Sequence, residues 1–196
     1  MTDKELLVEE VKSFAEKAKL MYKRNGEVSP ALFADCEKMG RGQVPIMLSN
    51  PLVKQLTTQI ACEILRDQGC KWYVFISEAW ILETKDKSAA KNKALIKKME
   101  TGEIRVSQHP DAVEVIVLQA ENKAGDHVLH MIKIKGGSIL GEEVKIGKAE
   151  DTKGLFSSIF ESKESHNAKN IVDDFLASHN IKVKEDFKEK ENKKWK

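Results

Sequence analysis

The feature that most constrains the fold is the run WYVFISEAWIL at residues 72–82, which is apolar on both faces of a strand. Side chains of a strand point alternately to the two faces of its sheet. One face therefore carries, in order, Trp72, Val74, Ile76, Glu78, Trp80 and Leu82. A carboxylate on such a face must be paired, solvated at a sheet edge, or used in chemistry. The run predicts a strand over residues 71–83 and makes Glu78 the first candidate site residue.

Two helices are predicted from the signals at their ends. The first covers residues 3–25, because Thr2 begins a capping box and Gly26 can end the helix in the left-handed conformation. The second covers residues 51–68, because an asparagine–proline pair opens it and Gly69 ends it. Both segments repeat apolar residues at helical spacing.

Two hairpins are predicted in addition to the long strand. The first joins residues 31–36 and 44–48, although the serine–proline pair at residue 29 would also suit the start of a short helix. The second joins residues 112–120 and 127–135, which alternate β-branched and polar side chains. Consecutive hairpins without intervening helices favour an antiparallel sheet over a doubly wound fold.

The register of the second hairpin follows if its turn near residues 122–125 is symmetric. Glu114 would then lie opposite Lys133, and Val117 opposite His130. One face would carry an almost pure β-branched surface, predicted to be core: Val113, Val115, Val117, Val128, Ile132 and Ile134. A slip of one residue would exchange the two faces of one strand.

The element order predicts an α+β fold, with a mainly antiparallel sheet of about five strands and helices packed against it. The length suits a single domain over residues 1–180, with a lysine-rich segment inserted at 85–106. Residues 136–147 suggest short strands and turns, and 168–178 a helix. Residues 181–196 are almost entirely charged or polar, which predicts a solvated tail.

Composition limits which kinds of partner the chain could bind and in which cellular compartment it could reside. The net charge of +2 and the scarcity of arginine give no general case for nucleic-acid binding. Cys36, Cys62 and Cys70 have neither disulfide-framework nor zinc-site spacing, so we expect reduced thiols in a cytoplasmic protein, with Cys62 and Cys70 buried as small apolar residues. No segment is long and apolar enough to span a bilayer, and the N-terminus does not resemble a signal peptide. We therefore expect no membrane association.

A candidate catalytic set combines Glu78 with His109, Asp111 and Glu114, and with His130 as a further imidazole. Imidazoles and carboxylates together could hold a divalent metal in a hydrolytic site. The sequence has no H-E-x-x-H or comparable spacing, and the glycines match neither a P-loop nor a dinucleotide fingerprint, so no cofactor is predicted.

Each member of this set also has a structural interpretation, which we favour. Glu78 could pair with a lysine or accept a hydrogen bond from a backbone amide near the strand end. His109 and Asp111 flank a proline in a natural turn entry, and Glu114 would form a cross-strand ion pair with Lys133.

Two short motifs resemble those of a loosely defined group of uncharacterised bacterial and phage proteins. They are S-E-A-W at residues 77–80, and H-P-D at 109–111 followed by Glu114. The resemblance covers residues 29–134. Ala112 stands where the group has an arginine, and the lysine-rich segment is a longer insertion here. The group has no known function, so the resemblance implies a fold and no activity.

The lysine-rich segment could form a basic strip for RNA, DNA or an acidic partner across residues 85–98, although charge runs are usually solvated helix faces. Its lysines are Lys85, Lys87, Lys91, Lys93, Lys97 and Lys98. The sequence therefore favours a non-catalytic binding or assembly factor of a prokaryote or phage. The alternative is a small metal-assisted hydrolase that uses Glu78, His109, Asp111 and Glu114. A homodimer would suit a strand that is apolar on both faces.

Overall fold

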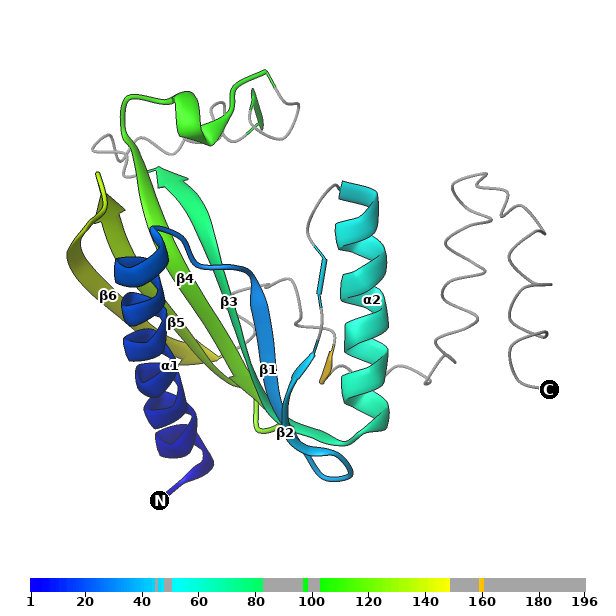
Figure 1. Cartoon of the computed structure of the whole chain (residues 1–196). Helices are drawn as coiled ribbons and strands as arrows, with labels where there is room; N and C mark the ends of the chain where they lie inside the picture. The colour runs from blue at the N-terminus through cyan, green and yellow to red at the C-terminus, as the bar shows by residue number, and fades with distance from the viewer. Residues whose placement is uncertain (45, 48–50, 83–96, 99–102, 149–158, 161–196) are drawn as a thin grey trace, which may run out of the picture.

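The computed structural model shows a six-stranded antiparallel sheet with one helix against each face (Figure 1). Among the described residues, no helix combines the length and the apolar character needed to cross a membrane. The structure describes residues 1–44, 46–47, 51–82, 97–98, 103–148 and 159–160. Most of the lysine-rich insertion, the helix predicted at 168–178 and the tail at 181–196 lie outside them.

The sheet has the strand order β2-β1-β3-β4-β5-β6, and every neighbouring pair is antiparallel. The elements are α1 (Asp3–Asn25), β1 (Ala31–Cys36), β2 (Gly40–Val44), α2 (Pro51–Asp67), β3 (Cys70–Leu82), the 3-10 helix η1 (Val106–Gln108), β4 (Ala112–Asn122), β5 (Asp126–Lys135) and β6 (Ser138–Lys148). The predicted α+β class and antiparallel sheet are confirmed. The sixth strand arises because the segment expected to form short strands and turns is one continuous strand, β6.

Helix α1 begins and ends where its sequence signals indicate. The Thr2 hydroxyl accepts a hydrogen bond from the Glu5 amide at 3.2 Å, and the Glu5 carboxylate accepts one from the Thr2 amide at 2.8 Å. Gly26 has φ +77°, and its amide donates to the Tyr22 carbonyl at 2.8 Å. These bonds satisfy backbone groups that a helix otherwise leaves open at its ends.

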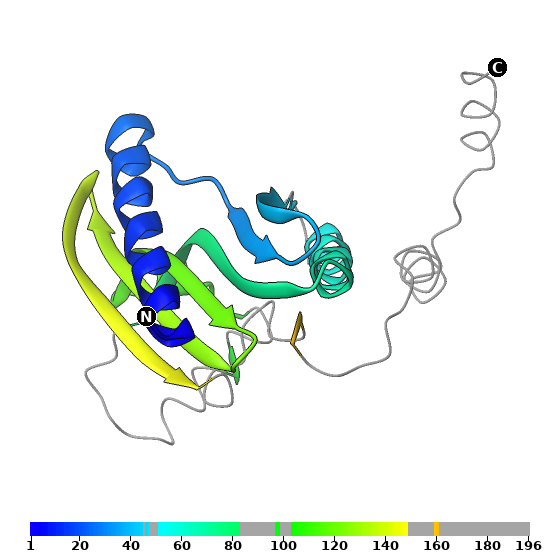
Figure 2. The ribbon, with the colours of Figure 1, turned by 90° about the horizontal axis from the view of Figure 1, so that it is seen from below.

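The apolar face of α1 packs across β3, β4 and β5, and the twisted sheet curves around the helix (Figure 2). Trp72, Val74 and Ile76 of β3 pack in the core with this helix, so the first half of the apolar face of the run at residues 72–82 is covered by its own chain, whereas Trp80 is 45% exposed. The same core includes from the helix Leu7, Val11, Ala15, Ala18 and Tyr22, and from the sheet Ile116, Leu118, Ala120, Val128, Ile132 and Ile134.

A second core lies on the opposite face of β1 and β3, against α2. Tyr73 and Phe75 alternate with the residues that face α1 and point into this second core. It is completed by Leu32, Ala34, Cys36, Val44, Ala61, Cys62, Leu65, Cys70 and Ile159. All three cysteines are buried and none of them forms a disulfide, and burial was predicted for Cys62 and Cys70. Strand β3 therefore contributes to both cores.

The predicted register of the β4–β5 hairpin is wrong by one residue. Glu114 lies opposite Ile134 instead of Lys133, and Leu118, not Val117, lies opposite His130. The proposed β-branched face is therefore divided: Val113, Val115 and Val117 lie on one face of the sheet, and Val128, Ile132 and Ile134 lie on the other, against α1.

The turn explains this shift. Asn122 and Asp126 flank a three-residue loop in which Gly125 has φ +75° and donates to the Asn122 carbonyl at 2.9 Å. The Asp126 amide also donates to the Asn122 side chain at 2.9 Å. A three-residue loop with a left-handed glycine has an odd number of residues, whereas the symmetric turn that we expected has an even number. One residue of difference moves every side chain of β5 to the other face.

A hairpin forms where the first one was predicted, but the bounds of its second strand are wrong, because residues expected in the connection form the strand. Strand β2 runs over Gly40–Val44, and Cys36 pairs with Gly40 across a turn at residues 37–39. Gly40 has φ +71°, a conformation that favours glycine and lets the chain reverse within a few residues.

Candidate interaction site on strand β6

Strand β6 forms one edge of the sheet and exposes apolar side chains there. No described strand pairs with its outer side. Val144 and Ile146 lie opposite His130 and Val128, so they point to the face that carries α1. Both side chains are 46% exposed. We refer to these two residues, together with the open backbone edge of residues 141–147, as the β6 surface.

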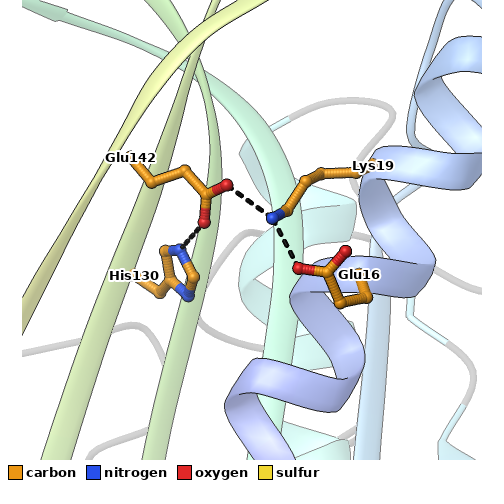
Figure 3. Close-up of polar contacts among 4 residues, drawn as sticks. All are labelled: Glu16, Lys19, His130 and Glu142. Atoms are coloured by element: carbon orange, nitrogen blue, oxygen red, sulfur yellow. Dashed lines mark hydrogen bonds and ion pairs between the residues drawn. The ribbon is translucent and has the colours of Figure 1, made fainter.

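A polar cluster links β6 to helix α1 (Figure 3). Glu142 points between the sheet and the helix, where one oxygen lies 2.8 Å from His130 Nε2 of β5 and the other 2.5 Å from Lys19 Nζ of α1. Lys19 also contacts Glu16 at 2.6 Å. The His130 side chain is 5% exposed and that of Lys19 is 15% exposed. The Glu142 side chain is 34% exposed and that of Glu16 is 71% exposed, so the charge-assisted hydrogen bonds that join the three elements are only partly shielded from solvent.

The cluster changes the ionisation of its members. The hydrogen bond from Lys19 lowers the pKa of Glu142; burial acts in the opposite direction, and the bond to His130 adds to the lowering. Burial lowers the pKa of Lys19, but its bonds to Glu142 and Glu16 outweigh burial and raise that pKa overall. Both shifts favour the ionised pair, so the link between α1 and β6 is charged at neutral pH.

These shifts predict an acid-dependent contribution to stability. Because folding lowers the Glu142 pKa, its stabilisation is fully present above the unfolded value of 4.5 and is lost as pH falls through the folded value. We expect the wild type to exceed Glu142→Gln in free energy of unfolding at pH 7, and the difference to shrink below about pH 4.5. Urea unfolding of both proteins at several pH values measures this difference. A difference that stays constant into acid would contradict the ionised pair.

A cavity of about 460 Å³ adjoins the end of β6, where Leu140 lies at a β-bulge. Leu140 is 61% exposed and Trp80 is 45% exposed, so the wall of this cavity presents apolar surface to solvent. Asp111 and Glu114 line the same cavity. The structure thus brings two of the predicted site residues together on one wall, beside an exposed tryptophan.

The other predicted site residues make local structural contacts. Glu78 accepts a hydrogen bond from the backbone amide of Val28 at 2.7 Å, which is the amide-capping role favoured from sequence. His109 Nδ1 accepts a hydrogen bond from the Asp111 amide at 3.2 Å. This bond stabilises the turn into β4. Neither residue lines the cavity that contains Glu114.

His130 lies on the other face of the sheet from the one that the sequence predicted, relative to Glu114. The corrected register places His130 and Glu114 on the same face of the sheet, whereas we expected opposite faces. His130 nevertheless pairs with Glu142 on the neighbouring strand. Within the part of the chain that the structure describes, no three side chains of His, Cys, Asp or Glu lie close enough to hold a metal ion.

Sequence reasoning missed Lys19 and Glu142. They are separated by 123 residues, and a single sequence gives no measure of such a contact. A weak signal was present on the helix, because Glu16 and Lys19 have the i,i+3 spacing of an ion pair beside the apolar stripe.

Comparisons with known proteins give no match. The sequence fits no model of a protein family, and searches of curated proteins and of solved structures find no similar protein.

Proposed function

We propose that this chain is a non-catalytic binding or assembly protein that takes up an extended strand of a partner along β6. The observation that carries the proposal is an edge strand of eleven residues, Ser138–Lys148, with two half-exposed apolar side chains beside its open backbone. Unpaired N–H and C=O groups on such an edge bind an added strand by backbone hydrogen bonds, and neighbouring side chains select its sequence.

Two further features support this site. Natural proteins usually protect long edge strands with charged side chains such as lysine, β-bulges, proline or a covering element. The bulge of β6 lies near its start, and Lys145 is paired with Glu143 at 3.2 Å. In β6 the inward carboxylate, Glu142, is already bound by Lys19 and His130 and therefore does not repel an added strand. The same contacts hold the strand against α1, which reduces the ordering that binding requires.

The experiment selects strand-forming peptides of about ten residues from a displayed random library on the immobilised full chain. Selected peptides are then titrated calorimetrically against the wild type and Val144→Lys. We expect Val144→Lys to weaken their binding by about tenfold or more, because a lysine on an edge strand opposes strand addition.

The matched control is Met39→Lys, an apolar-to-lysine change at a side chain that is 42% exposed in the β1–β2 turn. This variant should bind the peptides as the wild type does. Failure to select any peptide on a chain that sedimentation shows to be monomeric, or peptides that bind both variants equally, would contradict the proposal.

A further inference from the structure

We propose that the strand added at β6 is β6 of a second copy of this chain, paired antiparallel with Val144 on the two-fold axis. The inference rests on the proposed function, because it uses the same edge. Strand addition alone would accept many sequences, so the side chains of β6 must identify the partner and its register.

Symmetry leaves few registers to compare. When two identical antiparallel strands pair about a two-fold axis, the residue numbers of every opposite pair add up to the same total. Opposite side chains also lie on the same face of the sheet, so the axis must pass through a residue that faces its own copy. With the axis at Val144, Glu143 of each copy lies opposite Lys145 of the other, so the pairing contains two complementary charge pairs. These two residues already attract each other within one chain, at 3.2 Å.

The charged positions exclude the neighbouring registers. An axis at Glu142, Glu143 or Lys145 would place that residue directly opposite its own copy, and like charges in opposite positions are destabilising. An axis at Gly141, Ile146 or Gly147 would bring no opposite charges together. Between residues 141 and 147, the axis at Val144 is the one that pairs opposite charges without placing like charges together.

The face that carries α1 is also complementary in this register. Val144 would meet its own copy, which covers a side chain that is 46% exposed in the single chain. Ile146 would lie opposite Glu142 of the second copy. That carboxylate adds no unpaired charge to the interface, because Lys19 and His130 already bind it.

The test begins with sedimentation equilibrium of the full chain and its charge variants. The wild type should dimerise. Glu143→Lys or Lys145→Glu alone should weaken dimerisation by about tenfold or more, because each change creates two like-charge pairs. The double variant Glu143→Lys/Lys145→Glu exchanges the charges and should restore wild-type dimerisation, which a merely structural role of these surface residues would not produce.

A crosslink tests the position of the axis. In Val144→Cys the two introduced thiols would face each other, and diamide would oxidise them to an intermolecular disulfide by accepting their two protons and two electrons. Ile146→Cys is the control, since its thiol would face Glu142 and should crosslink far more slowly. The three native cysteines are buried.

The outcomes separate this inference from the proposed function. A wild type that stays monomeric, a double variant that does not recover, or equal crosslinking of both cysteine variants would overturn the second-copy inference. If selected peptides still bind in a manner that depends on Val144, the proposed function stands and another strand is its partner. Loss of both results would overturn both proposals.

Discussion

Leu118→Ala should lower the free energy of unfolding by about 2–5 kcal/mol, the largest effect that we expect from a single truncation. Leu118 is 0% exposed and lies in the middle of the core beneath α1, with Ile76 and His130 opposite it on the neighbouring strands. Alanine removes buried apolar surface and leaves a space that well-packed neighbours fill only partly. Urea unfolding at pH 7, followed by circular dichroism, measures the change.

The matched control is Leu20→Ala on the outer side of α1, where the side chain is 66% exposed. This change should alter the free energy of unfolding by less than about 0.5 kcal/mol, because alanine favours the helix and little buried surface is lost. Similar losses from both variants would mean that Leu118 does not occupy the core position described here.

The second large effect concerns Glu78. Glu78→Ala should lower the free energy of unfolding by about 1–3 kcal/mol. Val28 is buried in the segment that links α1 to β1, and the change leaves its backbone amide without the hydrogen-bond acceptor that Glu78 provides. Glu78→Gln keeps an acceptor oxygen in the same position and should cost less. The measurement is again chemical unfolding.

Glu114→Ala provides the comparison for Glu78. Glu114 lies on the same face of the sheet, one strand away, on the wall of the cavity. Its removal should change stability by less than about 0.5 kcal/mol. If Glu78→Ala also changes stability by less than about 0.5 kcal/mol, the contact with Val28 contributes nothing measurable to stability. That result would favour the alternative in which Glu78 belongs to a catalytic set.

Much of the fold could be predicted because its signals are local. The capping box at Thr2, the left-handed glycine at Gly26 and the continuous apolar run of β3 each act within a few residues. Strand β6 was harder to predict, since Gly141 and Gly147 interrupt it and suggest turns. Its pairing with β5 along the whole length outweighs the low strand propensity of these glycines.

The site could be predicted only in part, for a different reason. Glu78 and its amide-capping alternative were identified because an acid on an apolar strand requires a partner. The contact of Lys19 with Glu142 depends on how α1 lies across the sheet. No local sequence pattern predicts the orientation of the helix on the sheet. The prediction for His130 depended on the number of residues in the β4–β5 turn, and one residue there decides which side chains meet.

Because β3 contributes side chains to both cores, it affects how the protein unfolds. Trp72, Val74 and Ile76 belong to the core beneath α1, and Cys70, Tyr73 and Phe75 belong to the core beneath α2. Loosening either helix therefore removes packing from a strand that the other helix also needs. We expect the two halves to melt together in a single cooperative transition, and neither half to survive as an autonomous fragment.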